Sequence, residues 1–312
     1  MKLGKAPRIA YGEEVLELAK TNQDIVSLDA DLSKSTMSCL IEEHFPERFF
    51  EMSIAEQNMV ATAAGMALKG KIPFVNSFAV FLTGRAFDQI RQSVAYPANN
   101  VKVCGSSSGF SDFGDGATHQ SIEDLALMRS LPNMIVLSPV DEIETRAMVR
   151  FMAEHQGPVY IRLDRGDVPL VFDEGYQFKL GEPTVIQTGS DVTIFGTGQV
   201  IGLALQAAER LARHDISAEV VNVGTIKPLN EQAVMTVAEK TKAIVTVEEH
   251  NIHGGLGSAI AETLMKSKVP IVPVGIKDRF GQSAKTYEEL LTEYGITTDA
   301  ICDAAKEVLT LK

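Results

Sequence analysis

Short β-rich runs alternate with amphipathic helical stretches along most of the chain, and this alternation limits the possible folds more than any other feature. When strands and helices follow one another in this way, the strands run mostly parallel in a sheet and the helices cover both of its faces. The sequence therefore predicts an α/β protein. The first expected strands are 24–30, 48–52, 72–76, 101–105, 134–138 and 158–162, and the helices between them are 36–44, 55–69, 84–95, 121–130 and 141–155.

The alternation stops between residues 163 and 190, where polar sequence with Gly and Pro takes over, and it resumes near residue 191. Single hydrophobic cores also stop growing at roughly 250–300 residues, and this chain has 312. We therefore predict two doubly wound α/β domains, one over 1–165 and a smaller one over 191–312, joined by a linker over 166–190. The elements expected in the second domain are strands 192–196, 217–222, 243–248 and 271–275 and helices 200–213, 230–240 and 257–266.

Charge and hydropathy argue against two classes of partner. The chain has 41 acidic and 29 basic residues, a formal net charge of −12, and no basic run of the kind that follows a phosphate backbone. No apolar stretch is long enough for a bilayer span, and the N-terminus lacks the apolar core of a signal peptide. We therefore expect a cytoplasmic protein that binds neither nucleic acid nor a membrane.

No metal site is predicted on this chain. Cys39, Cys104 and Cys302 are widely spaced and form no CxxC pair, which argues against a disulfide framework or structural zinc and favours a reducing cytoplasm. The sequence Gly114-Asp115-Gly116 is similar to the metal- and diphosphate-binding motif of thiamine enzymes, in which a paired Asn follows. Here the nearest downstream Asn is the single Asn133, so the motif is incomplete.

Ser53 and Glu56 form an S-x-x-E pattern at the start of a predicted helix that is rich in Ala and Met. Taken alone, this pattern favours a capping box, in which the two side chains satisfy free N–H groups of the first helical turn. A functional role for Glu56 is the alternative.

Residues 105–120, GSSSGFSDFGDGATHQ, connect a predicted strand to a predicted helix and are rich in Gly and polar side chains. Such loops follow the carboxyl ends of parallel strands, where α/β sheets bind ligands. Asp115 and His119 are close enough in the sequence to converge on one polar ligand. A plain Gly-rich turn with a hydrogen-bonded His119 is the alternative.

Two further groups have both a structural and a functional interpretation. Phe78 and Phe81 follow strand 72–76 in what we expect to be a loop, where they would either stack on a flat ring or pack under the next helix. Arg8, Ser35 and Arg165 lie near element ends and would either hold a phosphate or be solvated.

Six segments, in order, resemble the C-terminal half of transketolase, which consists of a pyrimidine-binding domain and a C-terminal domain. The matching segments are DADLSKS, FFEMSIAEQNM, FAVFLTGRAFDQIR, GDGATHQSIEDLALMR, YIRLDRGDVP and VTVEEHNIHGGLGSAIAE. The resemblance covers nearly the whole chain and lacks the N-terminal domain that binds the thiamine diphosphate phosphates and Mg²⁺. It therefore implies the smaller subunit of a split transketolase.

The same resemblance implies an assembly. In this family the cofactor lies between domains of two protomers, so the chain is expected to act with a separate N-terminal subunit that holds Mg²⁺, in a heterotetramer with two copies of each chain. The C-terminal domain is expected to serve dimerisation and scaffolding, with His250 and His253 structural rather than catalytic.

The cofactor residues implied by the resemblance are Glu56, Phe78, Phe81 and Asp31. Glu56 matches the catalytic glutamate that hydrogen-bonds N1′ of the aminopyrimidine and favours its imino tautomer. Phe81, with Phe78 nearby, would flank the pyrimidine ring, and Asp31 lies in the same cofactor-facing loop. A third aromatic found in some transketolases is Gly84 here.

The substrate residues implied by the resemblance are Asp115 and His119 for the hydroxyls of the ketose, with His119 also catalytic, and Arg8, Ser35 and Arg165 for its phosphate. The implied reaction transfers a glycolaldehyde unit from a ketose phosphate to an aldose phosphate, as in the pentose phosphate pathway.

Ser107 departs from the family pattern. Many transketolases have at this position a histidine that reaches the acceptor phosphate, whereas serine is shorter and uncharged. We therefore expect one hydrogen-bond donor fewer to the phosphate of the acceptor sugar, and a relaxed or shifted preference among acceptor sugars.

Three alternatives stay open. The first is the β subunit of a 2-oxoacid dehydrogenase E1, which shares this domain order, although GATHQ and the arginines better suit a phosphorylated polyol. A 1-deoxy-D-xylulose-5-phosphate synthase-like activity is the second, although that enzyme is ordinarily one longer chain. A module without chemistry is the third, since fold alone does not give function.

Overall fold

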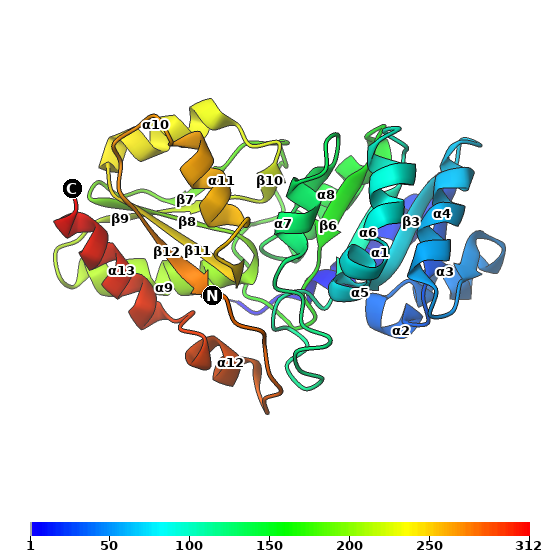
Figure 1. The fold of residues 1–312 in the computed structure, drawn as a ribbon, viewed down its shortest axis with the longest axis horizontal. Helices are drawn as coiled ribbons and strands as arrows, with labels where there is room; N and C mark the ends of the chain where they lie inside the picture. Colours follow the sequence, from blue (N-terminus) through cyan, green and yellow to red (C-terminus); the bar gives the residue numbers. More distant parts are fainter. Residues whose placement is uncertain (1) are drawn as a thin grey trace.

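The computed structural model describes residues 2–312 as two α/β units lying side by side, each built on its own sheet (Figure 1). The strand order of the seven-stranded sheet is β10 (Thr225–Lys227), β5 (Ile135–Leu137), β6 (Val159–Arg162), β4 (Lys102–Ser106), β3 (Ile72–Phe78), β1 (Ile25–Asp29) and β2 (Phe49–Glu51). The order of the five-stranded sheet is β12 (Ile271–Ile276), β11 (Ile244–Asn251), β8 (Val192–Gly196), β9 (Ala218–Asn222) and β7 (Thr184–Gln187).

Most strand pairs are parallel, which confirms the predicted fold class. The antiparallel pairs are β10 with β5 and β7 with β9, each at a sheet edge. The strand β10 belongs by sequence to the second unit but completes the sheet of the first. The two units are therefore joined through a shared sheet edge as well as through the intervening chain.

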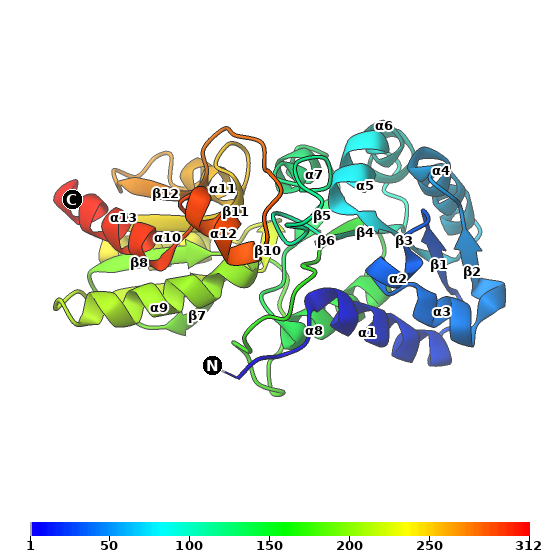
Figure 2. The ribbon, with the colours of Figure 1, turned by 90° about the horizontal axis from the view of Figure 1, so that it is seen from below.

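Helices cover both faces of the first sheet (Figure 2). On one face lie α1 (Pro7–Thr21), α2 (Ser33–Thr36), α3 (Cys39–His44) and α8 (Glu142–Glu154). On the other lie α4 (Glu56–Ala67), α5 (Ala79–Arg85), α6 (Phe87–Gln89), a π-helical turn (Ile90–Ala95) and α7 (Asp124–Arg129). Neighbouring residues of β3 point to opposite cores, because Phe74 packs with the first group and Val75 with the second.

The second sheet is also covered on both faces (Figure 1). The helices are α9 (Ile201–Ala212) and α13 (Thr298–Thr310) on one face and α10 (Glu231–Thr241) and α11 (Leu256–Thr263) on the other. A 3₁₀ turn (Gly198–Val200) precedes α9, and an extended segment after β12 leads to the short α12 (Tyr287–Glu293).

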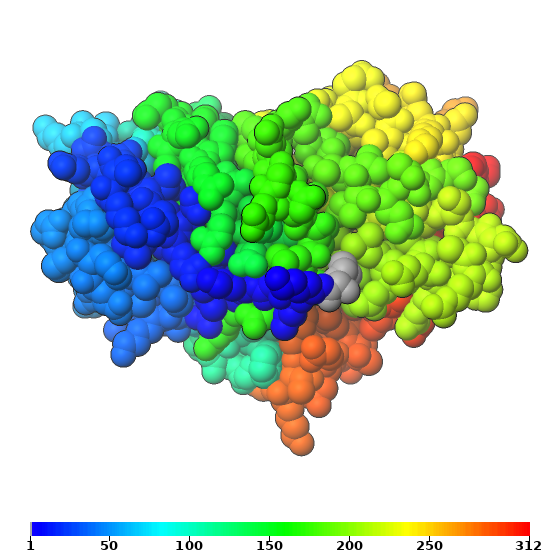
Figure 3. Space-filling model, turned by 180° about the vertical axis from the view of Figure 1, so that it is seen from behind, coloured from blue at the N-terminus to red at the C-terminus, as the bar shows by residue number. Residues whose placement is uncertain are grey.

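The N-terminal residues run across the connection between the two units (Figure 3). The Gly4 N–H donates to the Val168 carbonyl at 2.8 Å, and the Leu170 N–H donates to the Lys2 carbonyl at 2.9 Å. Within residues 2–312, no helix is both long and apolar enough to cross a membrane.

The structure differs from the sequence-based expectation in several elements. The helix α1 was not predicted, nor were α12 and α13 near the C-terminus. The expected linker contains β7, and β10 is too short to give a periodic signal. The expected helix 36–44 is divided into α2 and α3 because Met37 adopts a left-handed conformation, with φ 68°.

The topology brings the chemistry-bearing loops to one place. Strands β1, β3 and β4 are parallel neighbours, with Asp29 opposite Asn76 and Phe78 opposite Ser106. The carboxyl ends of parallel strands meet at one edge of a sheet. The loops that follow these strands therefore converge on a common crevice.

Candidate active site

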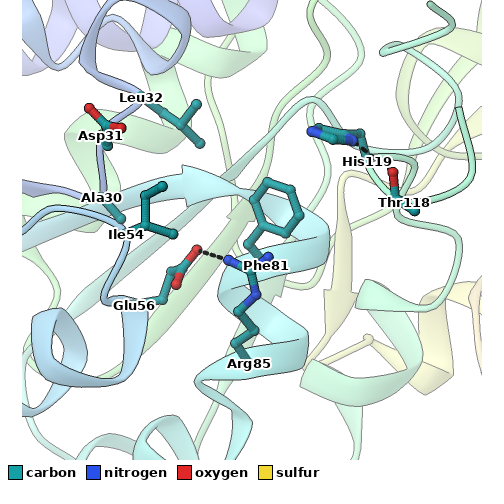
Figure 4. Close-up of a pocket in the computed structure, with 9 residues that line it drawn as sticks. All are labelled: Ala30, Asp31, Leu32, Ile54, Glu56, Phe81, Arg85, Thr118 and His119. Atoms are coloured by element: carbon teal, nitrogen blue, oxygen red, sulfur yellow. Dashed lines mark hydrogen bonds and ion pairs between the residues drawn. The ribbon is translucent and has the colours of Figure 1, made fainter. Parts of the chain in front are cut away.

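A cavity of about 370 Å³ lies at this edge of the first sheet (Figure 4). Its lining comes from the loop after β1, the start of α4, helix α5 and the loop after β4. The lining residues are Ala30, Asp31, Leu32, Ile54, Glu56, Phe81, Arg85, Thr118 and His119. An adjoining hollow shares Ile54, Glu56 and Arg85 and extends along the start of α4.

Glu56 is the first residue of α4, and only 3% of its surface is exposed. Its Oε1 accepts a hydrogen bond from Arg85 Nη1 at 2.8 Å. The capping-box interpretation is wrong: the N-cap is Ala55, no side chain caps the helix, and Ser53 has a φ of 55°. The result is a nearly buried acid that faces the cavity.

Aromatic rings form one wall of the cavity. Phe78 and Phe81 stack with centroids 5.9 Å apart, and His119 stands edge-on to Phe81 at 5.1 Å. The Arg85 guanidinium lies 4.3 Å from the Phe81 centroid, within cation–π range. Phe81 lies on α5, which begins at Ala79, so the expected loop is wrong and the helix starts five residues earlier than predicted. Phe78 is buried beneath Phe81 and does not line the cavity.

His119 reaches the cavity, whereas Asp115 does not line it. The Thr118 hydroxyl lies 3.0 Å from His119 Nδ1, which leaves Nε2 to meet a ligand. Asp115 is exposed on the same loop, near the buried carboxyl of Asp112. The structure therefore brings His119, Glu56 and Phe81 together and leaves Asp115 at the rim.

Arg8, Ser35 and Arg165 also come together. Arg8 donates from Nε to the Arg165 carbonyl at 3.1 Å and from Nη1 to the Ser35 carbonyl at 2.8 Å. Arg165 donates from Nη1 to Asp112 Oδ2 at 2.6 Å, and its guanidinium lies 5.9 Å from the Phe78 ring centroid. Burial, followed by the nearby charge of Arg165, lowers the pKa of Arg8. Two guanidinium groups so close together favour binding of an anion.

Two acidic residues that the sequence did not single out hold the loops of the cavity, and Glu51 is the first. Its Oε1 accepts the N–H groups of Asp31 at 3.0 Å and Ser53 at 2.7 Å, two residues with positive φ angles of 62° and 55°. Glu51 thus joins the loop after β1 to the start of α4. The signal available in the sequence was an acidic residue at a strand end, shortly before Glu56.

Asp29 is the second of these acidic residues, and it is fully buried at the end of β1. Its carboxylate accepts hydrogen bonds from the Leu32 N–H at 2.6 Å, the Thr36 hydroxyl at 2.6 Å and the Ser38 hydroxyl at 2.8 Å. Burial raises the pKa of Asp29 to about 6, although these hydrogen bonds oppose the shift. Asp29 therefore fixes the loop that carries Asp31 and Ser35.

Ser107 lies outside the cavity. It is fully buried after β4, has a φ of 52°, and its hydroxyl has no hydrogen-bond partner among residues 2–312. Burial, rather than the shortness of serine, is thus what keeps this side chain from a ligand in the cavity.

In the part of the chain that the structure describes, no group of three or more His, Cys, Asp or Glu side chains could hold a metal ion. The three cysteines are unpaired thiols. The cavity itself offers the carboxylates of Asp31 and Glu56, the imidazole of His119, the guanidinium of Arg85 and the ring of Phe81.

Two family descriptions match the chain. Residues 5–171 match the transketolase pyrimidine-binding domain, and residues 181–301 match the transketolase C-terminal domain. A putative transketolase C-terminal section from Methanocaldococcus jannaschii is 43% identical over 308 residues, which cover 97% of this chain and 96% of that protein.

Two further relatives are similar over nearly their full length. A 6-deoxy-6-sulfo-D-fructose transketolase subunit from Clostridium sp. (strain MSTE9) is 43% identical and covers 98% of this chain and 95% of its own. A solved structure described as "Split gene transketolase, inactive beta4 tetramer" is 48% identical, with a TM-score of 0.91 and 99% of both chains covered.

Proposed function

Because this chain belongs to the transketolase family, we propose that it is the C-terminal subunit of a split, thiamine diphosphate-dependent transketolase. The proposed reaction transfers a glycolaldehyde unit from a ketose phosphate to an aldose phosphate. The observation that carries the proposal is the nearly buried Glu56 carboxylate in a cavity walled by Phe81 and reached by His119.

The cavity fits the pyrimidine half of this cofactor. Leu32, Ile54 and Phe81 provide apolar surfaces for a flat ring, and Glu56 provides a carboxylate for a ring nitrogen. In this proposal the diphosphate and its Mg²⁺ belong to the separate N-terminal subunit, since this chain matches the pyrimidine-binding and C-terminal domains of the family.

Glu56 would hold a proton at N1′ of the aminopyrimidine. Its low exposure strengthens such a hydrogen bond. Arg85, now paired with Glu56 at 2.8 Å, is itself half exposed, so its side chain can turn into solvent and leave the Glu56 carboxylate to the ring nitrogen. When bound, thiamine diphosphate supplies the nucleophilic carbon and the electron sink for carbon–carbon bond cleavage.

The substrate would extend from the cavity towards the arginines. His119 Nε2 and the rim carboxylate of Asp115 are suited to the sugar hydroxyls, and His119 can transfer a proton there. Arg8 and Arg165, with Ser35 beside them, are suited to the terminal anion. Asp31 lines the cofactor side of the same cavity.

Activity is proposed to need both subunits, in a heterotetramer with two copies of each. The test mixes the purified chain with its N-terminal subunit, thiamine diphosphate and Mg²⁺, and measures transfer from xylulose 5-phosphate to ribose 5-phosphate. We expect turnover by the mixture and none by the chain alone. Turnover by the chain alone would contradict the split-subunit assignment.

The same assay compares donor sugars that carry a phosphate with one that carries a sulfonate. A relative carries the name of a sulfofructose transketolase subunit, and a sulfonate and a phosphate are both tetrahedral oxyanions. Ketose phosphates and 6-deoxy-6-sulfo-D-fructose are therefore compared as donors. A preference for a 2-oxoacid over every sugar would favour the E1-like alternative.

A further inference from the structure

The loop that carries Asp115 and His119 is held by the second α/β unit. We call residues 107–120 the substrate loop. The side chain of Glu249, which lies on β11 and is buried, accepts the Phe110 N–H through Oε1. Its Oε2 accepts hydrogen bonds from Gln199 Nε2 at 3.0 Å and from the Tyr287 hydroxyl. One carboxylate thus connects the substrate loop to the start of α12.

Backbone contacts continue this connection along the substrate loop. The Ala284 N–H donates to the Phe113 carbonyl at 2.9 Å, and Gln120 Nε2 donates to the Gln282 carbonyl at 2.9 Å. The extended segment before α12 therefore runs against the loop from Phe113 to Gln120, on both sides of Asp115.

Two glycines make this close approach possible. Gly109 has a φ of +56°, and a Cβ at this position would overlap Glu249 Oε1. Gly116 has a φ of +78°, and a Cβ there would contact the side chain of Ser283. The backbone of the substrate loop is thus shaped to fit the second unit.

The Glu249 carboxyl is buried among other charged groups, so its orientation depends on the groups that donate hydrogen bonds to it. Burial, followed by the nearby charge of Asp164, raises the pKa of Glu249 to about 7, and Arg162 opposes the shift. Arg162 is already engaged with Asp124 at 3.0 Å. The Phe110 N–H on one oxygen, and the Tyr287 hydroxyl with Gln199 Nε2 on the other, are therefore the groups that fix the direction of the Glu249 carboxyl.

We propose that Glu249 and Tyr287 are positioning residues, through which the second unit sets the substrate loop for sugar binding. This inference rests on the proposed function and extends it, because it gives the second unit a part in substrate recognition beyond scaffolding. Glu56, Phe81 and Arg85 lie on α4 and α5, outside the substrate loop. The effect should therefore fall more on the sugar substrate than on the cofactor, whose cavity the substrate loop lines only through Thr118 and His119.

The test compares Tyr287→Phe with Tyr176→Phe in the assembled enzyme. The Tyr176 hydroxyl donates at 2.8 Å to Glu144, another buried carboxyl whose pKa burial raises to about 7. Within residues 2–312, neither Tyr176 nor Glu144 is hydrogen-bonded to the substrate loop. The control thus removes the same kind of bond elsewhere, between the connecting segment and α8.

For Tyr287→Phe we expect the KM of the ketose donor to rise about tenfold, as for loss of one hydrogen bond to a charged group. Exchange of the cofactor C2 proton should stay at the wild-type rate. For Tyr176→Phe we expect both quantities to be unchanged. Glu249→Gln serves as a second variant, and amide hydrogen exchange at Phe110 should rise in it and in Tyr287→Phe.

The outcomes separate the two claims. A wild-type mixture without transfer activity would refute the proposed function. An active wild type with an unchanged KM in both Tyr287→Phe and Glu249→Gln would refute the positioning role. If Tyr287→Phe and Tyr176→Phe raised the KM of the ketose donor and slowed C2 proton exchange to the same extent, the effect would be a general structural one. That result would also refute the positioning role.

Discussion

Replacing Glu56 with Ala should separate catalysis from stability. Its ion pair with Arg85 is the interaction lost, and the Arg85 side chain is 50% exposed and still stacked on Phe81. Loss of such a pair costs roughly 0–1 kcal/mol of unfolding free energy. No helix cap is lost, so the additional cost of about 0.5–2 kcal/mol for a removed cap is not expected.

The expected effect on catalysis is much larger. Loss of a positioned proton-transfer partner lowers the rate by about 10²–10⁴-fold, which corresponds to roughly 3–5 kcal/mol in the activation free energy. We measure exchange of the cofactor C2 proton by NMR in the assembled enzyme and unfolding by urea.

The control is Glu13→Ala, which removes the ion pairs of this α1 residue with Lys5 and Arg146, away from the cavity. It should change stability by a similar small amount and leave exchange unchanged. Near-normal exchange in Glu56→Ala, with a stability loss of about 1–2 kcal/mol, would show that Glu56 is a structural residue and refute the reasoning.

Three further predictions concern residues around the cavity. Because burial raises the pKa of Asp29 from 3.8 to about 6, its contribution to stability is present below about pH 4 and is lost as the pH rises to about 6, by on the order of 3 kcal/mol. Asp29→Asn should remove this fall in the free energy of unfolding, which urea unfolding from about pH 4 to 7 measures. A parallel pH dependence in the wild type and the variant would contradict the prediction. Glu51→Ala should raise the cofactor KM about tenfold by freeing the N–H groups of Asp31 and Ser53, whereas Glu51→Gln keeps an acceptor and should restore binding. Ser107→His should destabilise the fold by about 1–3 kcal/mol because the site is buried; a stable variant with a changed acceptor preference would show that the position faces the substrate.

The alternation of strands and helices was sufficient to predict the fold class and to place one loop at the ligand-binding edge of the first sheet. Alternating strands and helices predict parallel sheets, and the carboxyl ends of parallel strands share an edge. For this reason the loop with His119 was expected at the ligand-binding edge, whereas the resemblance to transketolase added Glu56 and Phe81. The structure places all three on one cavity. Their chemical roles stay predictions.

Contacts between distant segments were decided only by the tertiary structure. The S-x-x-E pattern is local, and it predicted a cap that the left-handed Ser53 does not form. Glu51, by contrast, holds Asp31 from another strand end, which no local pattern indicates. The bond between Glu249 and the Phe110 N–H spans 139 residues. Periodicity records which face of an element is buried, but the partner of a buried polar group depends on how the elements pack.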